Sequence, residues 1–282
     1  MRYSFAGHET FTCKHYWLKK GYDHSVADKK FNDEAVIDLG VGKNMVNSIS
    51  FWMKAFGLYD KDVVLRDLLF HSKKGYDPYL EDLGTIWLLH YMLITTNKAS
   101  IYNLVFNYFR KLRIDFNVAQ LVKYLESECE KESQSFSSNS IKKDSSVFIN
   151  NYTKNLRAKS LEDQFNGMLY ELSLVEYIGK KSGQDTYRIE SKKRNNLPSE
   201  ILLASHLYFK GAGSISFNDL LNGKDSVGSV FGLNSDGLSL KIKDLEDLYP
   251  KSIRYSDTAG VQTLQIKENI DYETVLKNYY AR

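Results

Sequence analysis

The amino-acid sequence predicts a mainly α-helical protein with small β-hairpins, built from multiple winged helix-turn-helix-like units around a helical middle. Three observations lead to this fold class. A helix-turn-helix pattern occupies residues 33–56, with apolar residues at helical spacing on both sides of a glycine. A helix followed by a hairpin is predicted for residues 161–191, and a second hairpin for residues 253–266, each with a polar turn that contains glycine.

The composition is that of a globular protein with a core. Of the 282 residues, 43% are hydrophobic and 26% are charged, and the formal net charge is +3. This charge is too small to indicate a nucleic-acid partner by itself, so any basic surface must arise from local clustering. No apolar run approaches the roughly 20 residues that span a bilayer, and the first residues lack the apolar core of a signal peptide. We therefore expect a cytoplasmic protein without membrane contact.

The helix-turn-helix pattern begins with a short helix whose apolar stripe ends at Leu39, with Asp33 placed to cap its first turn. Gly40 is placed to adopt the left-handed conformation that ends this helix. The following "GVGKN" is not a phosphate-binding P-loop, because Ile37 and Asn44 stand where that loop needs its first glycine and its hydroxyl residue. A nucleotide cofactor is therefore not expected.

The second helix of the pattern has one apolar and one polar face. Its apolar residues recur at helical spacing from Met45 to Phe56, and the opposite face carries donors of the kind that contact phosphates and base edges. The alternative interpretation is an ordinary helical hairpin with a solvated face. The predicted nucleic-acid contacts on this face are Lys43, Asn44, Asn47, Ser48 and Lys54.

The middle of the chain is predicted to be helical. "KDVVLRDLLFHSKKGYD" is expected to form a short wing or a connecting turn. A strongly apolar helix follows in "DPYLEDLGTIWLLHYMLITT", with Asp77 and Pro78 marking its N-terminus. Further helices are expected in "IYNLVFNYFRKL" and "FNVAQLVKYLESECEKE". The Ser-rich "SQSFSSNSIKKDSS" is expected to be a loop that leads into the helix "SVFINNYTKN".

The C-terminal region predicts two helix-plus-hairpin units. "KKSGQD" is the turn of the first hairpin, and Asp257 to Gly260 are the turn of the second. The first hairpin is expected to act as a wing on phosphate; the predicted contacts are Lys180, Lys181, Arg188, Lys192, Lys193 and Arg194. The chain accordingly divides into an N-terminal motif plus helix-turn-helix (1–76), a helical middle (77–160) and a winged-helix-like region (161–282).

"GHETF" at residues 7–11 is the strongest candidate for chemistry. His8 and Glu9 are able to supply a metal ligand or a proton acceptor, and Lys19 and Lys20 follow closely enough to hold a phosphate. The structural alternative is that His8 and Glu9 tie the N-terminus to the body of the protein through hydrogen bonds.

Asp77 and Glu81 form a second carboxylate pair. On a helix, residues four apart share a face, so these two could bind a magnesium ion together with phosphate oxygens. Capping of the helix N-terminus is the competing interpretation, and it is favoured, because acidic residues are common there for electrostatic reasons.

Two other histidine patterns are interpreted as structural. His8, Cys13 and His15 match no common zinc spacing and lack a second ligand pair, so no metal is assigned to them. His90 lies in the strongly apolar helix and is expected to be a core histidine with its hydrogen bonds satisfied.

Six ordered blocks resemble a bacterial family, domain of unknown function 4007, over nearly the whole chain. They are "FAGHETFTCKHYWLKKGYD", "DLGVGKNMVNSISFW", "DPYLEDLGTIWLLHY", "SVFINNY", "LPSEIL" and "GSVFGL…DTAGVQTLQI". Leu83 and Val227 stand where proline is expected in the family, and both are local backbone changes. The resemblance carries over no set of catalytic residues.

The family includes SspB-like proteins of DNA phosphorothioation and anti-phage defence systems. The resemblance implies a protein that binds double-stranded DNA and acts as a metal-dependent DNA nickase, with Mg²⁺ or Mn²⁺ as the cofactor. It also implies a cysteine desulfurase, an ATP-pyrophosphatase-like sulfur-transfer protein and an ATPase as partners. A non-catalytic winged-helix adaptor that recruits these partners is the alternative. A transcriptional regulator ranks last, because the helical middle is longer than a simple repressor needs.

Overall fold

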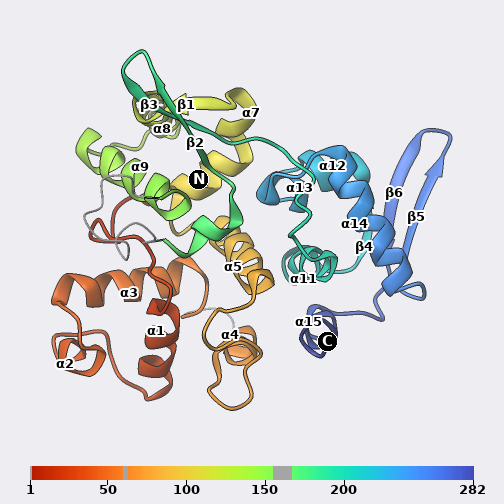
Figure 1. Cartoon of the computed structure of the whole chain (residues 1–282), viewed down its shortest axis with the longest axis horizontal. Coiled ribbons are helices and arrows are strands. Elements are labelled where there is room, and N and C mark those ends of the chain that lie inside the picture. Colours follow the sequence, from red (N-terminus) through yellow and green to blue (C-terminus); the bar gives the residue numbers. More distant parts are fainter. Residues whose placement is uncertain (1, 60–62, 155–166) are drawn as a thin grey trace.

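The structure is a computed structural model that describes residues 2–59, 63–154 and 167–282. It is mainly helical with two small antiparallel sheets, which confirms the fold class at this level. Figure 1 shows N-terminal helices at the lower left, a unit with the first sheet at the upper left and a unit with the second sheet at the right. None of the helices within these ranges has the length and apolar character required to cross a bilayer.

The N-terminal part consists of α1 (Trp17–Val26), α2 (Ala35–Leu39), α3 (Lys43–Ala55) and α4 (Val63–Phe70). The predicted helix-turn-helix is α2 and α3, and Gly40 ends α2 with a φ of 61°. Asp33 does not cap α2; its carboxylate lies 2.9 Å from Lys43 Nζ instead. In the segment expected to be a wing or turn, residues 63–70 form helix α4, because Leu65 and Leu69 are one turn apart and both are buried; residues 71–77 are the connection that leads toward α5.

Helix α5 (Leu83–Thr96) is buried on nearly all sides, as is typical of a helix at the centre of a protein. Its start is later than predicted, because Asp82 rather than Asp77 is the capping residue. The Asp82 carboxylate accepts hydrogen bonds from the backbone N–H groups of Gly84 and Thr85, at 2.7 and 3.3 Å.

The first unit with a sheet begins after α5. Its elements are α6 (Ser100–Leu104), the π-helix η1 (Val105–Phe109), α7 (Arg110–Leu112), β1 (Asp115–Asn117), α8 (Val118–Lys131), α9 (Ser138–Tyr152), the 3₁₀-helix η2 (Met168–Leu172), β2 (Glu176–Lys181) and β3 (Gln184–Arg188). The prediction of a Ser-rich loop is wrong for the second half of that segment. Helix α9 starts there, because the Ser137 side chain caps it by accepting from Ser140 N–H. The helix predicted from Leu161 falls largely outside the described residues.

The second unit with a sheet completes the chain. Its elements are α11 (Ser199–Lys210), β4 (Gly213–Ser216), α12 (Phe217–Asn222), α13 (Val227–Phe231), α14 (Ser235–Leu248), β5 (Ile253–Thr258), β6 (Val261–Ile266) and α15 (Tyr272–Tyr280). The predicted hairpin is present, with a turn shorter than expected. Asp257 still pairs with Gln262, so that only Ala259 and Gly260 form the turn, at φ values of 53° and 82°.

Both units repeat one topology. Each has a helical segment, a strand, further helices and a hairpin, and in each the first strand pairs with the last, giving the antiparallel orders β1–β3–β2 and β4–β6–β5. The domain boundary predicted between residues 160 and 161 runs through the first sheet, since β1 precedes it while β2 and β3 follow it. The pairing of distant strands therefore defines the units, and the local pattern does not.

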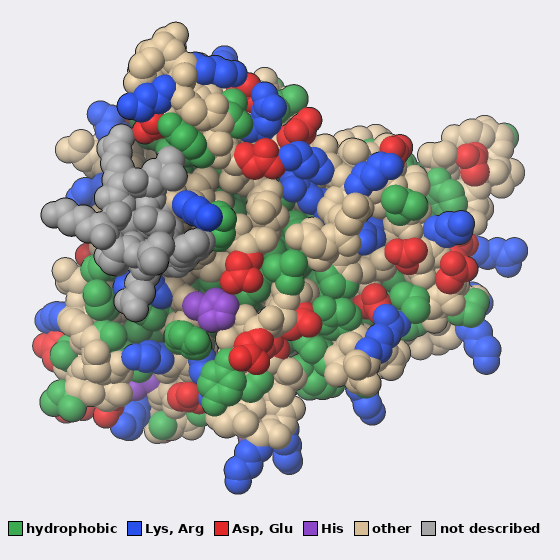
Figure 2. All heavy atoms as spheres, viewed as in Figure 1, with side chains coloured by type: hydrophobic (Ala, Val, Ile, Leu, Met, Phe, Trp, Pro, Cys, Tyr) green, Lys and Arg blue, Asp and Glu red, His purple; other side chains and the backbone are tan. Residues whose placement is uncertain are grey.

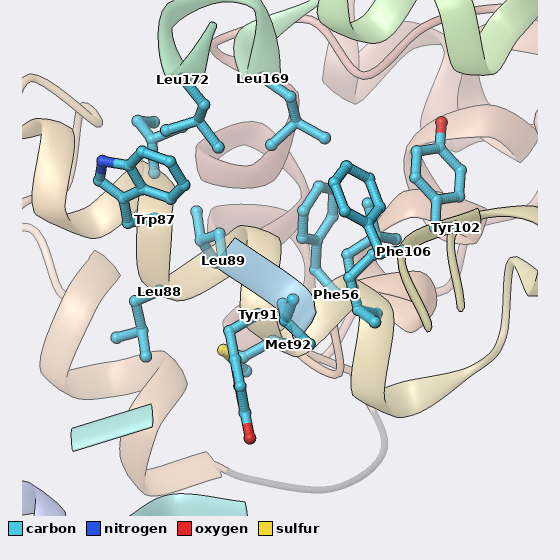
Figure 3. Packing of buried hydrophobic residues seen from close by; sticks show 14 of the residues in the cluster. Phe56, Trp87, Leu88, Leu89, Tyr91, Met92, Tyr102, Phe106, Leu169 and Leu172 are labelled. Carbon is cyan, nitrogen blue, oxygen red and sulfur yellow. The ribbon is translucent and has the colours of Figure 1, made fainter. Parts of the chain in front are cut away.

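The core surrounds α5 and is continuous between the parts of the molecule. Figure 3 shows Leu169 and Leu172 of η2 pointing toward Trp87 and Leu89 of α5, with Phe106 of η1 beside them. All five side chains are buried. Burial of apolar area on this scale is the main stabilising contribution to such a fold.

His90 is buried at the centre of α5 and has both ring nitrogens hydrogen-bonded. Its Nε2 lies 2.9 Å from the Val230 carbonyl oxygen, and its Nδ1 lies 2.9 Å from the Tyr152 hydroxyl. A carbonyl only accepts, so Nε2 carries the proton and Nδ1 accepts from Tyr152. Burial lowers the pKa of His90 from 6.5 to about 3, so the ring is neutral. The prediction of a satisfied core histidine is confirmed.

The lowered pKa of His90 predicts a contribution to acid sensitivity. Below pH 6.5 the unfolded chain protonates this histidine and the native protein does not. The free energy of unfolding should therefore fall by about 1.4 kcal/mol per pH unit as the pH drops from 6.5 toward 3. Urea unfolding of His90→Gln at several pH values should show a flatter acid limb than the wild type. The exposed His71→Gln variant is the control, and equal slopes in all three proteins would contradict the assignment.

Candidate functional site

The "GHETF" loop holds His8 in a fixed orientation. His8 is buried, its Nδ1 accepts a hydrogen bond from Thr10 N–H at 3.2 Å, and its ring stacks on Trp52 with centroids 6.0 Å apart. Its Nε2 lies 3.2 Å from Asp144 Oδ1, although the direction is not that of a hydrogen bond. Because Nδ1 already accepts a hydrogen bond, His8 cannot take a proton from a water molecule there without breaking the loop contact.

The backbone of this loop is strained. Ala6, Gly7, Glu9 and Thr10 all have positive φ, at 66°, 102°, 46° and 67°. A Cβ on Gly7 would lie 2.6 Å from the Phe51 ring, so that position also requires glycine for space. Several non-glycine residues in the left-handed region store free energy in a short segment, and such segments concentrate at functional sites.

Helices α3 and α9 hold the loop in place. From α3, Ser48 Oγ donates to the His8 carbonyl at 3.1 Å and Trp52 Nε1 donates to the Phe11 carbonyl at 3.2 Å. From α9, Asp144 accepts from Ala6 N–H at 2.9 Å. The N-terminal motif, the second helix of the helix-turn-helix and the "SVFINNY" helix thus meet at one place.

Ser48 was predicted to lie on the exposed face of α3, and this is wrong, because it is buried beneath the loop. The other predicted residues of that face are exposed. Lys43 is paired with Asp33, and Lys54 lies 5.2 Å from the centroid of the Tyr59 ring. The face is polar and accessible at Lys43, Asn44, Asn47 and Lys54.

Asp77 and Glu81 do not share a helix face. They precede α5, and the buried Asp77 carboxylate accepts from the N–H groups of Glu81 and Asp82 at 2.8 and 3.0 Å. Asp82 in turn accepts from the Tyr279 hydroxyl at 2.8 Å, which anchors α15. Asp77 is therefore a structural carboxylate. No hydrogen bond or ion pair between described residues joins Asp77 or Glu81 to His8 or Glu9.

Lys19 and Lys20 differ in accessibility. Lys19 is buried, and its ammonium donates to Asp23 at 2.5 Å and to Ser72 at 2.9 Å. It is therefore not available to hold a phosphate as predicted. Lys20 is exposed, and its ammonium donates to the Leu39 carbonyl at 3.1 Å.

Most cations of the predicted wing are neutralised within the protein. Asp115 of β1 accepts from Arg188 at 2.7 and 3.0 Å and from Lys181 at 2.8 Å, and these hydrogen bonds hold the pKa of its carboxyl well below the usual range. Lys192 donates to Glu176 at 2.5 Å, and Lys193 lies 3.4 Å from Asp236. Pairing of this kind leaves little net positive charge for a phosphate.

Arg194 and Lys180 are the remaining predicted wing contacts. Arg194 is buried and donates to the carbonyls of Ser173, Glu190 and Gly232, so it is a structural residue rather than a surface cation. Lys180 is exposed near the tip of the β2–β3 hairpin. Figure 2 shows basic and acidic side chains interspersed over the visible face, in keeping with the small net charge.

Lys142 and Lys143 were not predicted as contacts, and both are exposed on α9. Neither has an ion-pair partner in the part of the chain that the structure describes. The signal was present in the sequence as adjacent lysines in "SIKKDSS", which was interpreted as a loop. Because the segment is helical, its two lysines project from the surface of α9 at fixed positions and make that part of the surface positive.

Among the described residues, the predicted site residues are not gathered into a cluster of metal-ligand side chains. Within residues 2–59, 63–154 and 167–282 there is no group of three or more His, Cys, Asp or Glu side chains placed to hold a metal ion. Cys13 is fully buried, and burial raises the pKa of its thiol well above the ordinary value. Within these ranges, His8, Glu9, Asp77 and Glu81 are therefore not members of such a group.

Comparison with known proteins places the chain. A search of curated proteins returned no match. Two crystal structures are similar over 99% of this chain and 88% of theirs, each at 26% sequence identity: "Magnesium ion-bound SspB crystal structure", with a TM-score of 0.84, and "SspB crystal structure", with a TM-score of 0.83. The sequence model of the family described as "Protein of unknown function (DUF4007)" matches residues 5–280. Because that match covers nearly the whole chain, the protein belongs to the DUF4007 family.

Proposed function

We propose that this protein binds duplex DNA and nicks one strand as a component of a DNA phosphorothioation or anti-phage defence system. The observation that carries the proposal is α9, whose exposed Lys142 and Lys143 have no ion-pair partner among the residues that the structure describes. The similarity to SspB over almost all of the chain supports the biological setting. The nicking activity in this proposal rests on the resemblance to SspB-like proteins of the family.

The order of elements in the first unit supports DNA binding. Helix α6 with its π-helical extension, strand β1, helices α8 and α9 and the β2–β3 hairpin follow one another as in a winged helix. In helix-turn-helix proteins the second helix of the motif enters the major groove. Helix α9 occupies that position and presents Lys142 and Lys143 to solvent. Lys180 at the hairpin adds a third exposed cation.

The second unit has the same topology and a different surface. Its corresponding helix α14 exposes three carboxylates, Asp236, Asp244 and Asp247, against one lysine, Lys243, together with the apolar Leu240. Carboxylates next to phosphates are repelled, and Leu240 offers no hydrogen-bond donor. We therefore assign DNA binding to the first unit and not to the second.

The strained "GHETF" loop is our proposed position for the chemistry. Glu9 is exposed, so its carboxylate is accessible to a water molecule and a phosphodiester, whereas His8 is committed to the loop. His8 then acts as a positioning residue that keeps Glu9 in place. We propose Mg²⁺ or Mn²⁺ as the cofactor on the strength of the magnesium named for the similar SspB structure.

A non-catalytic DNA-binding adaptor is the second candidate. It is favoured by the structural use of Asp77, and by the finding that, among the described residues, no hydrogen bond or ion pair joins Asp77 or Glu81 to His8 or Glu9. In either case the proposed partners are a cysteine desulfurase, an ATP-pyrophosphatase-like sulfur-transfer protein and an ATPase, and the proposed location is the cytoplasm. These assignments rest on the resemblance to SspB-like proteins.

The first test concerns cutting. Purified protein, supercoiled plasmid and Mg²⁺ or Mn²⁺ should yield open circles, and EDTA should prevent this. Glu9→Gln should lower the nicking rate by at least about 100-fold, because the amide cannot accept a proton. The exposed Glu130→Gln is the matched control. A Glu9→Gln variant that cuts at the wild-type rate would show that Glu9 has no part in the chemistry. A wild-type protein that shifts the plasmid on a gel without cutting it would favour the non-catalytic adaptor.

The second test concerns α9. Replacement of Lys142 and Lys143 by glutamine should weaken DNA binding for all sequences alike. It should also reduce the slope of log affinity against log salt concentration by about 2, because each lost phosphate contact releases about one counterion fewer. Fluorescence anisotropy at several salt concentrations measures both. The exposed Lys277→Gln variant on α15 is the control, and an unchanged slope in the double variant would place the DNA elsewhere.

The third test concerns the N-terminal helix-turn-helix. Lys43→Gln combined with Asn47→Ala should weaken binding at low salt if α3 also contacts the DNA, since both side chains are exposed on one face. Binding that survives unchanged would remove α3 from the interface. Measured in the same assay, the α3 and α9 variants show which helix contributes more.

A further inference from the structure

A cavity of about 530 Å³ lies in the first unit, between the N-terminus of α8, one face of α9 and the β2–β3 hairpin. It is thus formed by the helix that we assign to DNA and by the hairpin that follows it. Its volume falls in the range of pockets that bind small ligands. Three elements from distant parts of the sequence build it, so it exists only once the first sheet is paired.

The cavity wall combines aromatic rings with amides. Tyr177 and Tyr187 contribute rings whose centroids are 5.7 Å apart and tilted by 58°. Asn117 and Gln184 are joined by a side-chain hydrogen bond of 2.6 Å, in which Asn117 Nδ2 donates to Gln184 Oε1. The Asn150 side chain of α9 lines the cavity and makes no hydrogen bond to any residue that the structure describes. Rings and amides of this kind match a flat, heteroaromatic ligand with both donors and acceptors.

Cations lie along the same side of α9. Lys143, Ser146 and Asn150 follow at helical spacing and share one face of α9, and Lys154 comes just after the end of the helix. Ser146, Asn150 and Lys154 line the cavity, and Lys143 is exposed one turn beyond. A ligand held here would therefore have its ring among the tyrosines and amides and its negative charge near lysine.

We propose that this cavity binds one nucleobase, unpaired and turned out of the stack, of a nucleotide whose phosphate lies along the lysine side of α9. The proposal rests on the proposed function, since it makes α9 the DNA-contacting helix. The tyrosine rings supply stacking, and Asn150 reads the hydrogen-bonding edge of the base. The protein thereby selects DNA sites at which a base is easily unpaired.

The test uses the full chain and two labelled duplexes that differ by a single mispaired base. The mispaired duplex should bind about ten-fold more tightly than the matched one, because its base is cheaper to extrude. Asn150→Trp fills the cavity and should abolish this preference. Asn150→Ala removes the amide without filling the space and should reduce it. Asn195→Trp, at an exposed asparagine outside the cavity, should leave it unchanged.

A second arm separates a base in a strand from a free nucleotide. Calorimetric titration with deoxynucleoside 5′-monophosphates detects a free nucleotide, and heat that is lost in Asn150→Trp assigns the cavity to that source. A mismatch preference without such heat assigns it to a base in a strand. Equal affinity for both duplexes together with no nucleotide binding overturns the inference while leaving DNA binding intact. If the protein binds neither duplex, the proposed function is refuted. The nucleotide titration then shows by itself whether the cavity binds a base.

Discussion

The hydrogen bonds of His90 join the two sheet-containing units to the central helix. Its ring accepts from Tyr152 of α9 and donates to the Val230 carbonyl of α13, so one neutral side chain on α5 holds an element of each unit. A buried polar group of this kind is stable only with both partners present. Since α9 carries the proposed DNA-binding lysines, the position of that surface depends on a contact in the core.

Buried arginines fix the two units relative to each other. Arg194, in the segment between β3 and α11, donates to the Ser173 carbonyl of the first unit and to the Gly232 carbonyl of the second. Arg110 donates to Ser191 in the same segment and to the Gly228 carbonyl. Burial lowers the pKa of each guanidinium to about 10, still well above neutrality. Charged donors that bind carbonyls from both sides resist relative movement of the units.

The charge on the two units distinguishes their roles more than their shared topology does. Helix α9 exposes lysines without acidic partners among the described residues, whereas α14 exposes three carboxylates, one lysine and Leu240. Function follows from such surfaces, since one architecture serves many partners. The strained "GHETF" loop lies between α3 and α9, so the proposed chemistry and the proposed DNA contacts adjoin each other.

By itself, the sequence determined the local structure. The helix end at Gly40 and the hairpin turns with glycine follow from backbone sterics, and the helices follow from the periodic spacing of their apolar residues. Only the tertiary structure decided which polar groups are accessible. The sequence pattern predicts that Ser48 and Lys19 are exposed, whereas packing of the helices buries both of them in the structure. The sequence pattern predicts Arg188 as a wing cation that contacts phosphate. In the structure, β1, which is distant in the sequence, places Asp115 beside it. The free energy of a charge depends on its neighbours and on its burial, and both are set by contacts that no local pattern contains.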